Sequence, residues 1–106
     1  MLLKGIKIVE MGQAIAGPFV GTVFADLGAQ VIKVEPPAGD SARTWGPLDA
    51  NGDTGIFHYM NRNKTSVTLD VRQPEDRALF DKLIDEADVF VHNLRPGVAG
   101  KLGIDA

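Results

Sequence analysis

The feature that most constrains the fold is a pair of short apolar segments separated by one helix length of sequence. Residues 6–10 read IKIVE and residues 30–35 read QVIKVE, and both have the apolar, β-branched character of strands. Between them, Pro18 suits the first turn of a helix and Gly28 suits its end. The apolar residues of this segment recur at helical spacing on a single face: Val20, Val23, Phe24 and Leu27. This order predicts a right-handed crossover between parallel strands.

The rest of the chain continues the same α/β pattern. SVTLDV at residues 66–71 predicts a third strand after a long loop, and Pro74 opens a helix whose apolar residues repeat the periodicity. DVFVHN at residues 88–93 predicts a fourth strand, and residues 96–102 predict a short helix closed by Gly103. At 106 residues the chain fits one domain. Because it stops just after a helix with only four predicted strands, we expect residues 1–106 to be an incomplete piece with an open sheet edge and an uncovered apolar face.

Composition narrows the possible partners. The net charge is −3 and the pI is near 5.2, so no basic field favours nucleic acid, and any anion site must be local. The absence of cysteine excludes disulfides, thiolate metal sites and a cysteine nucleophile within these residues, and it is compatible with a cytoplasmic location. The apolar N-terminal segment is interrupted by Glu10 and Gln13 and ends at Asp26, so it predicts neither a signal peptide nor a membrane span.

Ligands of open parallel sheets bind beyond the carboxyl ends of the strands. We therefore inspect the loops at residues 11–17, 36–47 and 93–97, which all carry glycine and proline. Gly12, Gly17 and Gly21 lack the G-x-G-x-x-G spacing of a dinucleotide site, and the residues after Gly17 exclude a P-loop. A receiver-type site needs an acidic pair after the first strand, and Glu10 is followed by Met.

The residues alone define no catalytic group and no metal site. His58 and His92 have no visible partner and are interpreted as structural, and Trp45 as an anchor of its loop that could also stack on an adenine. The polar run NRNK at residues 61–64 is, on its own chemistry, a solvated turn.

Four stretches taken in order change that interpretation: AGPFVGTVFADLGAQVIKVEPPAGD, TWGP, MNRNKTSVTLD and ADVFVHNLRPGVAGKLGID. Together they closely resemble the N-terminal part of the family III CoA-transferases, the family of formyl-CoA and carnitine-CoA transferases that also includes the α-methylacyl-CoA racemases. The resemblance covers essentially the whole chain. It implies that residues 1–106 are the N-terminal part of a Rossmann-like, CoA-binding large domain, whose remainder and a smaller second domain lie outside them.

The resemblance also implies an activity. Family members form interlocked homodimers and transfer CoA from an acyl-CoA to a carboxylic acid acceptor through an acyl-aspartyl anhydride. CoA is a substrate rather than a tightly bound cofactor. The family's nucleophilic aspartate lies in a later segment, so the expected set of catalytic residues within this chain is empty, and the 106-residue chain alone is expected to be inactive.

The CoA-binding residues carried over by the resemblance fall in three segments and one helix. The first loop supplies Ile15 and Ala16, the polar run supplies Asn61, Arg62, Asn63 and Lys64, the loop after the fourth strand supplies Asn93, Leu94 and Arg95, and the last helix supplies Lys101. A few placed cations suit the pyrophosphate and 3′-phosphate of CoA.

Three positions depart from the family pattern. Ile15 stands where some members have glutamine, Pro36 where some have a CoA-contacting arginine, and Lys101 in place of an arginine, which loses bidentate geometry. Two alternatives stay open at this point: an α-methylacyl-CoA racemase-like isomerase and a non-catalytic CoA-binding module.

Overall fold

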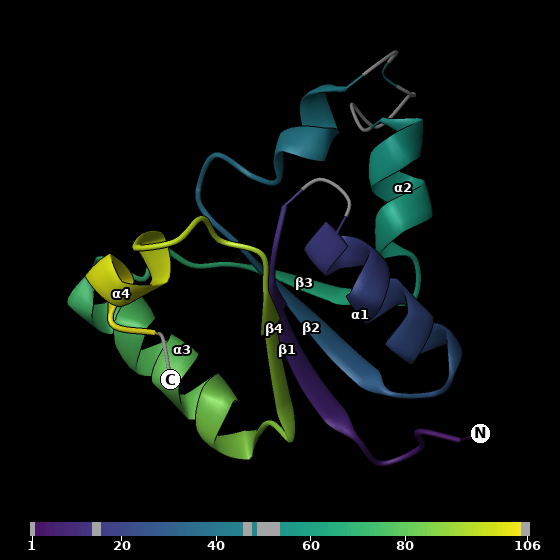
Figure 1. Cartoon of the computed structure of the whole chain (residues 1–106), viewed down its shortest axis with the longest axis horizontal. Coiled ribbons are helices and arrows are strands. Elements are labelled where there is room, and N and C mark those ends of the chain that lie inside the picture. Colours follow the sequence, from purple (N-terminus) through teal and green to yellow (C-terminus); the bar gives the residue numbers. More distant parts are fainter. Residues whose placement is uncertain (1, 14–15, 46–47, 49–53, 105–106) are drawn as a thin grey trace.

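The computed structural model describes residues 2–13, 16–45, 48 and 54–104, and it contains a four-stranded parallel sheet in the order β3-β2-β1-β4 (Figure 1). The strands are β1 (Lys7–Met11), β2 (Gln30–Glu35), β3 (Thr65–Thr68) and β4 (Val89–His92). Strand β1 pairs in parallel with both β2 and β4, and β2 pairs with β3. The predicted α/β architecture, its parallel pairing and its four strands are confirmed.

Helices cover both faces of the sheet. Helices α1 (Ala16–Asp26) and α2 (Gly55–Asn61) lie on one side, and α3 (Pro74–Glu86) and α4 (Val98–Leu102) lie on the other (Figure 1). The alternation of side chains along β1 divides the core accordingly. Ile8 packs with Ala25 on the α1 side, whereas Val9 packs with Phe80 on the α3 side. Glu10 and Lys33 therefore point toward the same side as α1.

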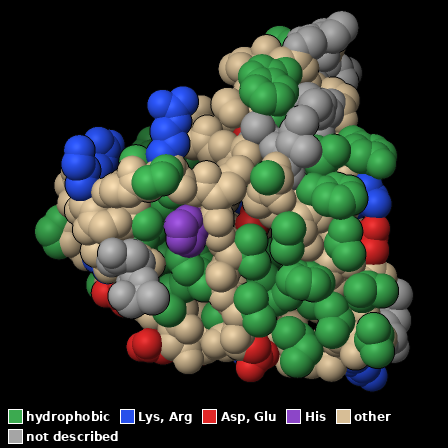
Figure 2. All heavy atoms as spheres, viewed as in Figure 1, with side chains coloured by type: hydrophobic (Ala, Val, Ile, Leu, Met, Phe, Trp, Pro, Cys, Tyr) green, Lys and Arg blue, Asp and Glu red, His purple; other side chains and the backbone are tan. Residues whose placement is uncertain are grey.

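Helix α1 packs on the sheet mainly through small residues. Its buried residues are Gly17, Pro18, Gly21, Thr22 and Ala25. Within the predicted periodic face, Phe24 is half-buried against the core, whereas Val20, Val23 and Leu27 remain 37–39% exposed. Figure 2 shows hydrophobic side chains gathered over this helix. Part of the outer face of α1 is therefore apolar and exposed.

The segment between β2 and β3 is the main correction to the sequence-based interpretation. Within the predicted long loop the structure has a 3₁₀ helix (Ser41–Thr44) and helix α2. Thr54 caps α2 by accepting a 3.3 Å hydrogen bond from the backbone N–H of Phe57, and the Arg43 guanidinium lies 3.7 Å from the centre of the Phe57 ring. A helix of seven residues is too short to show clear periodicity, which is why it was missed.

Two further element boundaries differ from prediction. Strand β3 ends at Thr68 rather than continuing to residue 71, although the backbone N–H of Leu69 still donates to Glu35. Helix α4 begins at Val98 because Gly97 has a left-handed backbone, with φ of 87°. None of the helices in the described part of the chain has the length and apolar character needed to cross a membrane.

Candidate functional site

The strand order reverses between β1 and β4, and the loops after these strands meet at the carboxyl edge of the sheet. At this edge a pocket of about 200 Å³ opens on the α3 and α4 side. Its lining is mostly apolar, with one guanidinium at residue 72: Met11, Gly12, Gln13, Val34, Pro36, Pro37, Leu69, Asp70, Val71, Arg72, Leu94 and Leu102. A concave apolar site at a switch point is where open α/β sheets bind their ligands.

Asn93 ties the two loops at the switch point together. Its side-chain Nδ2 donates to the carbonyl of Gln13, and its Oδ1 accepts from the backbone N–H of Gln13, both at 3.0 Å. Such close approach requires residues without a β-carbon. A Cβ on Gly12 would lie 2.9 Å from Asn93 Oδ1 and 3.0 Å from the Cα of Gly17. The glycines that fail to form a dinucleotide motif therefore have a packing role in this structure.

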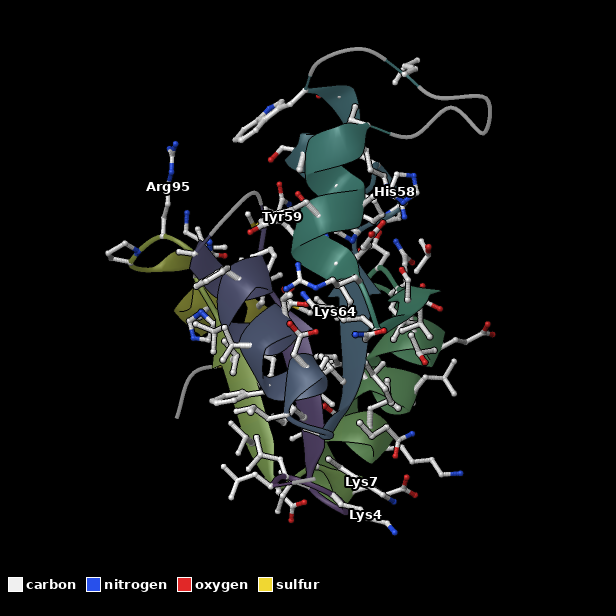
Figure 3. All side chains as sticks on the ribbon, turned by 90° about the vertical axis from the view of Figure 1, so that its right-hand side faces the viewer. Lys4, Lys7, His58, Tyr59, Lys64 and Arg95 are labelled. Atoms are coloured by element: carbon white, nitrogen blue, oxygen red, sulfur yellow. The ribbon has the colours of Figure 1, made fainter. Side chains whose placement is uncertain are left out.

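Three cationic side chains are exposed around this edge. Arg72 is 73% exposed and forms a two-point ion pair with Asp70, Nε to Oδ1 at 3.0 Å and Nη2 to Oδ2 at 3.3 Å. These hydrogen bonds hold the pKa of Asp70 below its usual value. Arg95 projects outward from the loop after β4 (Figure 3), and Lys101 is exposed on α4. Positive charge and an apolar pocket thus lie at one edge of the sheet.

Arg77 anchors α4 near this edge. Its guanidinium donates to the carbonyls of Leu102 and Gly103, the latter at 2.7 Å, and its Nε pairs with Asp81 at 2.9 Å. The helix that carries Lys101 is therefore held against α3 by side-chain bonds to its last carbonyls, which lack partners within the helix.

The polar run at residues 61–64 lies on the opposite side of the sheet from the pocket, next to α1 and α2. Arg62 pairs with Asp26 at 2.7 Å and Asn63 donates to the same carboxylate at 3.0 Å. The hydrogen bond from Arg62 lowers the pKa of Asp26. Asn61 donates to the carbonyl of Phe57 at 3.0 Å. Each of these side chains is engaged within the protein.

Lys64 is buried, with a side chain only 1% exposed. Its ammonium donates to the carbonyl of Pro18 at 2.7 Å, to Asn61 Oδ1 at 3.0 Å and to Glu10 Oε2 at 3.2 Å. Figure 3 shows it between α1 and the end of α2. Burial lowers the pKa of Lys64, while the Glu10 carboxylate acts in the opposite direction.

The structure thus brings together some of the predicted residues and not others. Asn93 to Arg95 lie at the carboxyl edge with the first loop, Lys101 lies nearby on α4, and Ala16 begins α1 with an exposed side chain. Ile15 lies outside the described residues. Residues 61–64 lie on the other side of the sheet, and their contact with CoA stays a prediction.

Sequence reasoning missed the stretch at residues 69–72, which lines the pocket. The signal was available, because this loop follows a parallel strand and must reach the same edge as the loops after the other strands. The three loops inspected in the sequence did not include it. Among the described residues, no group of three His, Asp or Glu side chains is arranged to hold a metal ion.

These features define a class of protein: an open, Rossmann-like parallel α/β domain with an apolar, cation-flanked ligand pocket at its switch point. A family model described as CoA-transferase family III matches residues 3–106. Succinyl-CoA–D-citramalate CoA-transferase of Chloroflexus aurantiacus is 43% identical over 103 residues, covering 96% of this chain and 26% of that protein. Acetyl-CoA:oxalate CoA-transferase of Acetobacter aceti is 41% identical, covering 95% of this chain and 26% of that protein.

A comparison with a solved structure supports the same family. A CAIB/BAIF family protein from Brucella suis superposes with a TM-score of 0.91 at 47% identity, covering 97% of this chain and 28% of that one. The chain belongs to CoA-transferase family III. It spans about a quarter of the length of the curated relatives it matches, at 26% of each.

Proposed function

We propose that this chain forms the CoA-binding, N-terminal part of an acyl-CoA:carboxylate CoA-transferase. One observation carries the proposal: Arg72 lines the apolar pocket at the switch point, and the exposed cations Arg95 and Lys101 are each adjacent in sequence to a residue of that lining. CoA combines a nucleotide that suits an apolar recess with phosphates that suit guanidinium and ammonium groups. The relatives named above are CoA-transferases, which supports a transferase rather than a racemase.

In the whole enzyme, an aspartate from beyond this chain attacks the thioester. One of its carboxylate oxygens forms a bond to the acyl carbon, the carbon–sulfur bond breaks, and CoA leaves as the thiolate. The acceptor carboxylate then attacks the aspartyl carbonyl of this anhydride and displaces the donor acid as its carboxylate. The thiolate attacks the acceptor's acyl carbon in the new anhydride, forms the acceptor's CoA thioester and releases the aspartate carboxylate. CoA must stay bound throughout these steps. Tight binding of its nucleotide, away from the reacting atoms, keeps it in place. We further propose that the enzyme is a cytoplasmic, interlocked homodimer.

The binding part of the proposal is tested by isothermal calorimetry of CoA with the full-length protein. Arg72→Gln removes one charge at the pocket, and Lys4→Gln removes one charge at the opposite edge of the sheet (Figure 3). A charge-assisted contact with phosphate contributes about 1–2 kcal/mol, so Arg72→Gln should weaken CoA binding roughly 5- to 30-fold. Lys4→Gln should change the dissociation constant less than about twofold. Equal effects of the two variants would place the nucleotide elsewhere.

The reaction is tested by following an acyl-CoA with a free carboxylate acceptor. We expect the full-length protein to form the acceptor's CoA thioester and the 106-residue chain to form none. Turnover by the 106-residue chain would refute an aspartate beyond it. Full-length protein that binds CoA without turnover would favour a non-catalytic binding module, and exchange of the α-proton without transfer would favour the racemase.

A further inference from the structure

We propose that Lys64 is a positioning residue: from beneath α1, it fixes the first turn of that helix at Pro18 and thereby sets the affinity of the pocket for CoA. Lys33 holds the backbone directly after β1, at Gly12. The inference rests on the proposed function, because the property that it predicts is CoA affinity. It assigns Lys64 a role without contact with the ligand.

The first step is the ionic cluster formed by Glu10, Lys33, Asp40 and Lys64. Lys33 Nζ lies 2.8 Å from Asp40 Oδ2 and 3.4 Å from Glu10 Oε1, and Lys64 Nζ lies 3.2 Å from Glu10 Oε2. The side chains of all four are at most 1% exposed. The charges balance as two ammonium groups and two carboxylates, so the cluster can exist as ions inside the core.

The second step is that the ammonium groups of Lys33 and Lys64 also donate hydrogen bonds to backbone carbonyls. Lys33 Nζ donates to the carbonyl of Gly12 at 3.2 Å, and Lys64 Nζ donates to the carbonyl of Pro18 at 2.7 Å. The first carbonyl directly follows β1, and the second belongs to the first turn of α1. Gln13, next to Gly12, is held by Asn93 from the loop after β4. The backbone after β1 thus depends on Lys33 and the first turn of α1 depends on Lys64, and Glu10 links the two cations.

The third step is the fit of α1 over Lys64. A Cβ on Gly21 would lie 3.1 Å from both Cε and Nζ of Lys64 and 3.5 Å from Cγ of Glu10. The helix therefore packs directly against the buried ammonium, and the distance between its first turn and the sheet depends on that group. The pocket lies on the other side of β1, and Gly12 and Gln13, which follow β1, form part of its wall. A Cβ on Gly12 would lie 3.0 Å from the Cα of Gly17, so the first turn of α1 packs against this wall and its displacement changes the shape of the pocket.

The fourth step explains why charged rather than apolar side chains occupy this buried cluster. Buried ion pairs are often replaceable by apolar groups with little loss of stability. An apolar replacement, however, cannot donate a hydrogen bond to a backbone carbonyl. Stability and position are therefore separable properties of this cluster, and a pair of variants can separate them.

The test uses the full-length protein and two variants. Lys64→Met keeps an unbranched side chain, one heavy atom shorter, but leaves Glu10 with one fewer cation, and we expect Tm to fall by roughly 5–15 °C and CoA binding to weaken. Glu10→Gln combined with Lys64→Met restores the charge balance with Lys33 and Asp40. We expect this double variant to regain most of the lost Tm while CoA binding stays roughly three- to tenfold weaker than in the wild type.

The readouts discriminate among the roles of Lys64. Because Lys64 does not contact the ligand, the affinities for CoA and for dephospho-CoA should fall by the same factor. Backbone hydrogen exchange should become faster in the peptide joining β1 to α1 but not in β2. Recovery of CoA affinity together with Tm in the double variant would overturn the inference. So would a selective loss for CoA over dephospho-CoA, which would make Lys64 a 3′-phosphate ligand. If the wild type fails to bind CoA, the proposed function fails, while the exchange measurement still decides whether Lys64 fixes this connection.

Discussion

Replacing Gly12 by alanine tests the close packing of the loops at the switch point. The added Cβ would lie 2.9 Å from Asn93 Oδ1, 3.0 Å from the Cα of Gly17 and 3.1 Å from the Cδ of Pro18. All three atoms belong to parts of the structure that are fixed by other contacts, so no single side chain can swing away. The connection must open, and the two hydrogen bonds between Asn93 and Gln13 are the first to be lost.

The magnitude follows from these contacts. Two hydrogen bonds of about 1 kcal/mol each and an overpacking penalty of about 1–3 kcal/mol oppose a gain of about 0.4–1 kcal/mol from the reduced entropy of the unfolded chain. The net expected loss in the free energy of unfolding is about 2–4 kcal/mol. With a slope of about 2 kcal/mol per molar urea, this moves the urea midpoint down by roughly 1–2 M.

The assay is urea unfolding followed by far-ultraviolet circular dichroism, with Gly55→Ala as the matched control. A Cβ on Gly55 meets nothing within 4 Å, so the same chemical change there should leave the midpoint unchanged or raise it slightly. In an Asn93→Ala background, Gly12→Ala should cost less by about 2 kcal/mol, because both hydrogen bonds to Gln13 are already absent and the nearest obstacle is gone. A Gly12→Ala chain as stable as the wild type, or an equal loss at Gly55, would refute the packing argument.

Two further predictions concern the other layers of the structure. Phe80 is 2% exposed and packs edge-on against Phe90, with 5.8 Å between the ring centres. Phe80→Ala should therefore lower the free energy of unfolding by about 3–5 kcal/mol, whereas Leu79→Ala, at an exposed neighbouring position, should lower it by less than about 1 kcal/mol. Similar losses in the two variants would contradict the assigned core. Arg72→Gln should raise the pKa of Asp70 toward its ordinary value of 3.8, as read by NMR titration of that carboxyl group. Because the folded-state pKa of Asp70 is depressed, its contribution to stability is present above the unfolded pKa and is lost as pH falls through the folded value, and this pH dependence should shrink in Arg72→Gln. An unchanged titration midpoint would rule out Arg72 as the cause.

The sequence was sufficient for the main elements of the fold because local patterns encode them. Strand β2 has the predicted bounds, and α3 begins at Pro74 as predicted. Helix α1 was recognised from an apolar stripe, although most of that stripe is exposed, with only Phe24 packed against the core, while Gly21 and Thr22 face the sheet. Periodicity identifies a helix whichever face is buried, so it could not tell which side of α1 would meet the sheet.

The candidate site was less predictable, because its residues meet through tertiary contacts. The loop containing Asn93 was identified from its place after a strand, but its bonds to Gln13 depend on β4 lying beside β1. Lys64 illustrates the converse. A lysine in a polar run reads as exposed or ligand-binding, and only the positions of Glu10 and α1 reveal that its ammonium is buried.

The central position of β1 has a consequence for synthesis on the ribosome. Strand β1 is synthesised before both of its neighbours, and β4 follows β2 by more than fifty residues of sequence. At about 5–20 residues per second, β1 waits several seconds with one edge unpaired after β2 has appeared. During that interval Val9 and Met11 lack the cover of α3, which makes the nascent chain a natural client for chaperones that shield apolar segments.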